Sequence, residues 1–236
     1  MEEIVFTLSP ESSWIDESFY PVPASKEVPE WYKNMEASKG SSKENPLLVY
    51  DSQTIKRCMP VFDAITTGYI LKTFTDIYIN PSKDGAGTEV RWAYDTQDTI
   101  SFHSSYQLQN YKNMKIDKDA PKFRSPWFIK TPPGYSCLFI SPLHRPHVGF
   151  KIMEGIVDTD QYKTAVQLPF LLDDGFEGLI PAGTPIAQVI PFKRTDFKMR
   201  IGGEKELAES MKDFHTLKAT FINGYKNKFR VKKNYL

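Results

Sequence analysis

The segments YSCLFIS (residues 135–141), TAVQLPFLL (164–172) and PIAQVIPFKR (185–194) decide the fold class of this chain. Each is a short run rich in apolar, β-branched and aromatic residues that ends at a turn signal, which is typical of a β-strand. Three further runs of the same kind, WFIKT, FKIMEGIVD and GLIPAG, complete a block of short β segments between residues 127 and 194. Strands at this spacing, without long helices between them, favour an antiparallel sandwich or barrel over βαβ units. The sequence therefore predicts a mainly β fold.

The region before this block divides into an arm and the first part of the core. Residues 1–57 hold one candidate strand, at 3–8, and several prolines, which remove ladder donors and restrict their neighbours. We expect an extended N-terminal arm here, anchored by Trp31 and Tyr32 and lying across the core or across a neighbouring subunit. The β core itself is expected over residues 58–200.

The start of the core predicts one short helix and several strands. MPVFDAITTGY (59–69) favours one or two helical turns, because Pro60 suits a first helical position and Gly68 suits the end. YILKTFTDIYIN (69–80) alternates and predicts a strand. TEVRWAYD and TISFHS predict two more strands around a turn at 95–98, after a GAG turn at 85–87.

Residues 201–236 differ from the core and predict a helix followed by a basic tail. EKELAESMKDFHTLKATFI (204–222) places apolar side chains on one face of a helix, which Gly224 is expected to end. The residues of this stripe are Leu207, Met211, Phe214, Leu217 and Phe221. The cations of the tail are Lys226, Lys228, Arg230, Lys232 and Lys233.

Composition excludes several classes of protein. Lys and Arg number 30 and Asp and Glu 29, so the formal net charge of +1 gives no overall attraction to nucleic acid or acidic lipid. The acidic N-terminus has no long apolar run, so neither a signal peptide nor a membrane span is expected. Cys58 and Cys137 are too few for a secreted disulfide scaffold and are expected as free thiols. We therefore expect a cytoplasmic protein, with residence in a virus particle still allowed.

Three motifs between residues 131 and 194 occur in an informative order. They are PPGYSCLFISP (132–142), EGIVDTDQY (154–162) and GLIPAGTPIAQVIPF (178–192). Together they resemble the second, third and fourth motifs of the dUTPase/dCTP-deaminase superfamily. The resemblance implies a β-clip core of the dUTPase kind. It also implies a homotrimer, since strands and tails commonly complete neighbouring subunits in that superfamily.

The same resemblance suggests site residues. In the superfamily an Asp of the third motif positions the attacking water and a Tyr packs on the deoxyribose, so Asp158 and Tyr162 would be catalytic if the chain is active. Arg145, Asp160 and Gln188 would then bind ligand at a site between subunits, with Mg²⁺ as helper. Gln188 also stands out chemically, because a polar side chain in so apolar a strand needs hydrogen-bond partners if it is buried.

The chain departs from the superfamily where phosphates are held. SPLHRP (141–146) stands where an Arg-Ser-Gly triplet is expected, and Lys163-Thr164 stands where a glycine should follow DTDQY. No Gly-rich C-terminal lid is present. Cradling phosphates requires backbone N–H groups in a geometry that glycine permits, together with a positive charge. We therefore expect the fold to be kept and triphosphate hydrolysis to be lost.

The whole chain also resembles a family without an agreed activity that occurs in tailed phages and some bacteria. The shared features are PEWY (29–32), CMPVFDA (58–64), PPGY (132–135) and GLIPAGTPIAQ (178–188). This resemblance implies a phage-related protein and supplies no reaction.

Three alternatives stay open at the level of sequence. His103, His144 and His147 are a candidate metal site, or His144 and His147 belong to a solvated turn. Asp158 and Asp160 are an acid/base or metal pair, or they cap a turn. The basic tail contacts nucleic acid or an acidic partner, or it is solvated; its interleaved apolar residues favour docking on another surface.

Two function classes follow. The first is a non-catalytic, self-assembling structural or binding protein, phage-related, without cofactor, with itself and other phage structural proteins as partners. The second is a deoxynucleotide-binding or nucleotide triphosphate-hydrolysing enzyme of the dUTPase/dCTP-deaminase type that uses Mg²⁺.

Overall fold

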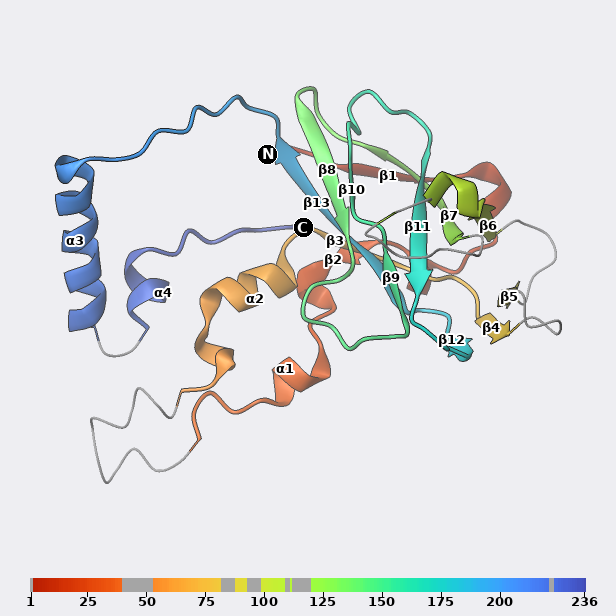
Figure 1. The fold of residues 1–236 in the computed structure, drawn as a ribbon, viewed down its shortest axis with the longest axis horizontal. Coiled ribbons are helices and arrows are strands. Elements are labelled where there is room, and N and C mark those ends of the chain that lie inside the picture. The colour runs from red at the N-terminus through yellow and green to blue at the C-terminus, as the bar shows by residue number, and fades with distance from the viewer. Residues whose placement is uncertain are drawn as a thin grey trace.

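A computed structural model describes residues 2–39, 53–81, 88–92, 99–108, 111, 120–220 and 223–236 of the chain. The described residues form three antiparallel sheets, and the helices lie at the periphery (Figure 1). This confirms the predicted mainly β fold class. The turns predicted at 85–87 and 95–98 lie outside the described residues.

The first sheet has the order β1-β7-β11-β9, and β6 also pairs with β7. Its long central strand β7 alternates between buried and more exposed residues over most of its length, as a strand with one face on the core should. The strands are β1 (Val5–Leu8), β6 (Ile100–His103), β7 (Ala120–Lys130), β9 (Phe150–Ile152) and β11 (Ala165–Leu172).

The second sheet has the order β10-β8-β13-β3-β2, so the apolar strand β13 lies at its centre. The predicted segment FKIMEGIVD is divided between the two sheets, since its first half forms β9 and its second half β10. The strands are β2 (Val22–Pro23), β3 (Tyr69–Lys72), β8 (Tyr135–Ile140), β10 (Gly155–Val157) and β13 (Pro185–Lys193).

The third sheet is small and has the order β12-β4-β5, with β4 (Ile77–Pro81), β5 (Thr88–Trp92) and β12 (Gly178–Ile180). The single strand predicted over residues 69–80 is wrong, because β3 and β4 belong to different sheets. The chain turns between them at Thr73, which is buried and whose N–H and hydroxyl donate to the carbonyls of Thr184 and Pro181 at 2.9 and 2.8 Å.

One cluster of buried apolar side chains joins the three sheets. Phe123 of β7 stacks on Phe170 of β11 with ring centroids 4.1 Å apart, and Phe150 meets both rings edge-on. Phe139 of β8 and Ile79 of β4 contribute to the same cluster. Burial of this kind supplies the main driving force for folding, so all three sheets stabilise one another.

The N-terminal arm lies across the core of its own chain. Its two strands extend the first and second sheets, because β1 pairs with β7 and β2 with β3. The short helix α1 (Glu30–Asn34) buries Tyr32, whose ring stacks on Phe62 of α2 (Met59–Thr66) at 5.9 Å between centroids. The predicted anchoring by Tyr32 is thus a contact with α2.

Helix α2 (Met59–Thr66) confirms the short helix predicted at the start of the core. It ends before Gly68, which has a φ of +73°. An added Cβ at this position would lie 2.1 Å from the carbonyl oxygen of Val189, so only glycine lets the chain pass so close to β13.

Beyond β13 the chain leaves the body of the molecule. Residues 195–203 are extended and lead to helix α3 (Glu204–Ala219), which has no buried residue and stands apart from the sheets in Figure 1. Gly224 does not end this helix as predicted. It begins a further short helix, α4 (Gly224–Lys228), which packs on α3 so closely that a Cβ at position 224 would lie 3.1 Å from Leu217 Cδ1.

The tail after α4 returns to the body, where Tyr235 meets Tyr69 of β3 at 5.9 Å between ring centroids. In the described part of the chain no helix combines the length and the apolar character that crossing a bilayer requires.

Candidate functional site

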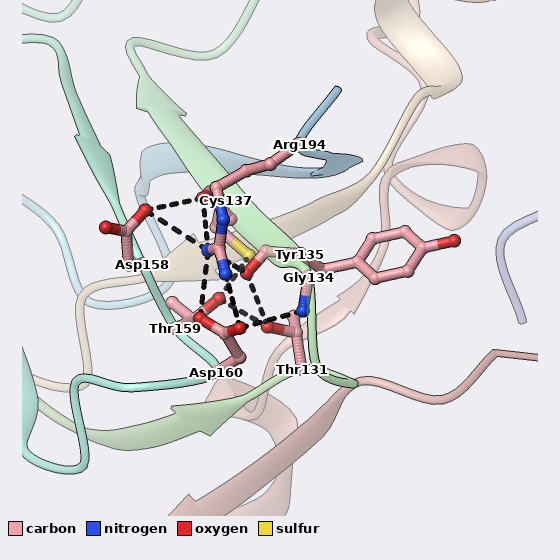
Figure 2. A network of polar contacts seen from close by, with 9 residues as sticks. Thr131, Gly134, Tyr135, Cys137, Asp158, Thr159, Asp160 and Arg194 are labelled. Carbon is pink, nitrogen blue, oxygen red and sulfur yellow. Dashed lines mark hydrogen bonds and ion pairs between the residues drawn. The ribbon is translucent and has the colours of Figure 1, made fainter. Parts of the chain in front are cut away.

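The predicted Asp158 and Tyr162 lie in one turn that follows β10. The N–H groups of Gln161 and Tyr162 both donate to the carbonyl oxygen of Asp158, at 2.9 and 2.8 Å. This turn meets the start of β8 and the end of β13, where Arg194 follows the last residue of the strand (Figure 2).

Arg194 holds the turn through what we call the arginine clasp, formed by Arg194, Asp158, Asp160 and the backbone of residues 134 and 135 (Figure 2), together with the side chain of Ser136. Its Nη1 lies 2.9 Å from Asp160 Oδ1 and its Nη2 donates to Asp160 Oδ2. The same Nη1 lies 2.9 Å from the carbonyl oxygen of Tyr135 and 2.9 Å from Ser136 Oγ. A guanidinium that engages both oxygens of a carboxylate fixes its orientation as well as its charge.

Asp160 is the buried member of the clasp, since its side chain is only 2% exposed. The hydrogen bonds from Arg194 hold the pKa of this carboxyl far below its usual range, although burial opposes them. The N–H of Gly134 adds a further hydrogen bond at 2.8 Å. The same contacts raise the pKa of Arg194. Asp160 is therefore an ionised structural carboxylate.

Asp158 is the exposed member, with a side chain that is 61% exposed. Its Oδ1 accepts a hydrogen bond of 2.6 Å from Ser136 and lies 3.3 Å from Arg194 Nη1. Tyr162, in the same turn, is also exposed. The two aspartates thus differ in burial and partners, and they do not form a symmetrical acid/base pair.

A chain of small polar groups lies beneath the clasp. The hydroxyls of Thr131 and Thr159 are 2.7 Å apart, and that of Thr159 donates to Cys137 Sγ at 3.4 Å. Burial raises the pKa of the Cys137 thiol to about 11, so almost no thiolate exists near neutral pH. Both cysteines are free thiols, as predicted.

Gln188 lies away from the clasp, in the first half of β13, and is fully buried. Its Oε1 accepts from the N–H of Leu143 at 2.9 Å. Its Nε2 donates to the carbonyls of Ala64 and Thr67 at 2.9 and 2.6 Å. All these partners are backbone groups of this chain, so the side chain joins the end of α2 to the loop after β8.

Arg145 also lies apart from the clasp, in that loop. Its Nη1 donates to the carbonyl oxygen of Glu27 in the N-terminal arm. Burial lowers the pKa of its guanidinium, and within the described chain its Nε and Nη2 are buried without a hydrogen-bond partner. The structure therefore brings together Asp158, Asp160 and Tyr162, and it places Arg145 and Gln188 elsewhere.

The three histidines of the predicted metal site lie in separate surroundings. His103 Nδ1 lies 2.9 Å from Gln107 Oε1, and His147 pairs with Asp173. His144, at a φ of +54°, accepts a hydrogen bond of 2.9 Å at its carbonyl from the indole N–H of Trp31. No group of three or more His, Cys, Asp and Glu side chains in the described ranges could hold a metal ion, so these histidines do not form the predicted site.

Sequence reasoning missed a second cluster, the tail clasp, formed by Asp63, Arg230 and Lys233. Arg230 Nε and Nη2 lie 3.1 and 2.6 Å from Asp63 Oδ1, and Lys233 Nζ lies 2.9 Å from Asp63 Oδ2. The guanidinium also covers the Phe62 ring at 5.5 Å. The signal available in sequence was an Asp within the apolar helix MPVFDAIT, because a buried carboxylate requires a cation.

Two cations of the basic tail are thus engaged by their own chain. Arg230 and Lys233 contact Asp63, whereas Lys226, Lys228 and Lys232 are exposed.

Comparison with known proteins gives matches among solved structures alone. No family model matches this chain, and no curated protein matches it. Among solved structures it is similar to a variant dUTPase of phage phi11 of Staphylococcus aureus, with 11% identity over 86% of this chain and 97% of the other, and a TM-score of 0.32. A variant dUTPase of Staphylococcus bacteriophage 80alpha, with dUpNHpp, shows 10% identity over 86% of this chain and 89% of the other, and a TM-score of 0.33.

Proposed function

We propose that this protein is a non-catalytic, self-assembling structural or binding protein of phage type. The observation that carries the proposal is the C-terminal arm, residues 195–219, which leaves the body after β13 and whose helix α3 has no buried residue. In its extended part the side chains of Phe197, Met199 and Ile201 are 92%, 85% and 90% exposed. Exposed apolar side chains that are grouped in this way indicate a site where another molecule binds.

The free energy of association favours an arm that binds through both its extended part and α3. Burying Phe197, Met199 and Ile201 stabilises a complex by about 1.5–3 kcal/mol per side chain, or about 5–9 kcal/mol together. Association costs about 4–15 kcal/mol in lost freedom of motion, so the extended part alone gives at best a weak complex. The exposed α3 residues Leu207, Met211, Phe214 and Leu217 add the area that a stable complex needs.

The arrangement of polar groups supports a non-catalytic role. The carboxylate of Asp160 is neutralised by Arg194 of the same chain, and Gln188 uses its amide on backbone groups. Of the proposed site residues, Asp158 and Tyr162 are at the surface, and the guanidinium beside Asp158 is already engaged by Asp160.

The partners in this proposal are further copies of the chain, with a trimer as the preferred state, and other phage structural proteins. The host cytoplasm and the virus particle are the proposed locations.

The test compares the mass in solution of the wild type with that of Phe197→Ser/Met199→Ser/Ile201→Ser, the arm variant, by light scattering over a range of concentrations. We expect the wild type to assemble and the arm variant to be monomeric. A matched control, Lys205→Ser, changes an exposed cation of α3 outside its apolar stripe and should assemble as the wild type does. A monomeric wild type at all concentrations would refute the proposal.

The alternative function is deoxynucleotide binding or hydrolysis with Mg²⁺ at Asp158 and Tyr162, and the observation in its favour is the exposure of both side chains in one turn. Thermal unfolding with a panel of deoxynucleotides, with and without Mg²⁺, tests it. Stabilisation that Asp158→Asn abolishes would replace the proposed function by this one.

A further inference from the structure

We infer that the arm of one copy adds as a strand to the free edge of β12 in a second copy, so that the chains join head to tail. This inference rests on the proposed function and names the surface that receives the arm. It starts from the sequence Phe197-Lys198-Met199-Arg200-Ile201, which alternates apolar and cationic residues in an extended backbone. Alternation with period two is the pattern of a strand that buries one face.

The receiving edge is the outer side of the third sheet. In the order β12-β4-β5, strand β12 pairs with β4 on one side, and no other described strand pairs with its second side. Leu179 of β12 is directly opposite Tyr78 of β4, and both side chains are exposed. An edge strand with an exposed apolar face is a template for pairing with another strand. In such a pairing the main-chain hydrogen bonds provide affinity and the side chains provide specificity.

The charges of the two segments are complementary. Residues 171–180 hold Asp173, Asp174 and Glu177 and no Lys or Arg, whereas residues 197–201 hold Lys198 and Arg200 and no acid. Asp173 pairs with His147, and Arg200 pairs with Glu206. The other charged residues are Asp174 and Glu177 in the loop before Leu179 and Lys198 in the arm, so the two segments carry net charges of opposite sign. Opposite charges steer two surfaces into encounter and disfavour other pairings.

We assign the receiving edge to a second copy because, within one copy, the arm and β12 lie far apart. The arm and α3 project from one end of the long axis of the molecule, and β12 and β4 lie at the other end (Figure 1). A contact between different surfaces of identical chains is heterologous, and it closes into a ring or continues as a filament. The edge strand β10 is a weaker receiver, because the residue opposite its exposed Ile156 is Leu138, which is partly buried.

The test uses the arm variant Phe197→Ser/Met199→Ser/Ile201→Ser, the edge variant Leu179→Lys and the control Ile156→Lys, all at exposed positions. Circular dichroism and unfolding midpoints establish that each is folded; if Leu179→Lys is not, Tyr78→Lys replaces it. We expect both the arm variant and the edge variant to lose self-assembly, and Ile156→Lys to keep it.

Mixing the two variants tests whether the arm of one copy binds the β12 edge of another. The edge variant retains an intact arm and the arm variant retains an intact edge, so an equimolar mixture should form a 1:1 complex in light scattering and nothing larger. A mixture that stays monomeric, or assembly lost through Ile156→Lys and kept through Leu179→Lys, would overturn the inference. If the arm variant is monomeric while the edge variant assembles fully, the proposed function stands and this receiving surface is wrong.

Discussion

At the scale of single residues, two arginines fasten the C-terminal part of the chain. Arg194 fixes the root of the arm through Asp160, and Arg230 fixes the tail through Asp63. Both carboxylates are largely shielded from solvent. Removing one partner of such a pair leaves the other charge buried and uncompensated, which destabilises more than the net value of the pair suggests.

The first prediction concerns pH and Asp160. The pKa of this carboxyl in the folded protein lies far below its unfolded value of about 4, so the unfolded state binds more protons as the pH falls. Its stabilising contribution is therefore complete above about pH 4 and is lost progressively at lower pH. Urea unfolding of the wild type and Asp160→Asn should show a difference in stability that shrinks towards acid pH.

The neighbouring aspartate supplies the control for this experiment. Asp158→Asn alters an exposed carboxylate of the same turn, and its difference from the wild type should be smaller. A difference between the wild type and Asp160→Asn that stays constant across the acid range would contradict the assignment of Asp160 as an ionised structural group.

The second prediction concerns Gln188. Replacing it by Met removes hydrogen bonds to the N–H of Leu143 and the carbonyls of Ala64 and Thr67, all in a buried region. Each unsatisfied buried group costs about 1–3 kcal/mol, and we expect a total loss of about 3 kcal/mol in the free energy of unfolding. The matched control is Gln167→Met, because Gln167 Oε1 is buried and has no hydrogen-bond partner in the described chain. Equal losses for the two variants would refute the role of Gln188.

At the scale of elements, α2 is the junction between arm, sheet and tail. Phe62 stacks on Tyr32 of the N-terminal arm, and Asp63 binds Arg230 and Lys233 of the tail. Its last turn is held by Gln188 of β13 through the carbonyl of Ala64. A short helix without strong propensity is stabilised by such tertiary contacts, because isolated helices of this length are marginal.

The third prediction releases the tail. Arg230→Met should destabilise the protein by about 3 kcal/mol, since Asp63 is only 10% exposed and loses its main partner. Limited proteolysis should then cleave the tail after α4 faster than in the wild type. Lys228→Met, at an exposed position of α4, is the control and should leave both stability and cleavage unchanged. Slow cleavage in Arg230→Met would mean that Tyr235 and Lys233 suffice to hold the tail.

Local sequence patterns predicted where single strands lie better than they predicted which strands belong to the same sheet. The short apolar, β-rich runs of β8, β11 and β13 depend on neighbouring residues only, so they are visible in the sequence. The break between β3 and β4 was not, because it depends on Thr73 binding residues 181 and 184, more than a hundred positions away.

The candidate site shows the same limit. The turn from Asp158 to Tyr162 was predictable from its motif, whereas Arg194 reaches it only because β13 pairs with β8, a contact between distant segments. Gln188 was correctly expected to need partners if buried, yet the identity of those partners, in α2 and in the loop after β8, depends on the tertiary fold.

At the scale of the whole molecule, the arm leaves the body after β13, and the chain returns to the body only beyond α4. The arginine clasp holds its root and the tail clasp holds the chain beyond α4, whereas α3 has no buried residue between them. Such an arrangement keeps an apolar segment in reach of a partner while its ends stay fixed, which limits the freedom lost on association.

The fourth prediction follows from this arrangement. Because association stabilises the folded state by mass action, the thermal unfolding midpoint of the wild type should rise with protein concentration. Above the dissociation constant, each tenfold increase adds about 1.4 kcal/mol per bound site. Leu207→Gln/Met211→Gln removes apolar surface from the exposed face of α3, so its midpoint should depend much less on concentration and should equal that of the wild type when both are dilute. Differential scanning calorimetry over a hundredfold range of concentration measures this, and a wild-type midpoint that does not move would show that the arm binds no further copy of the chain.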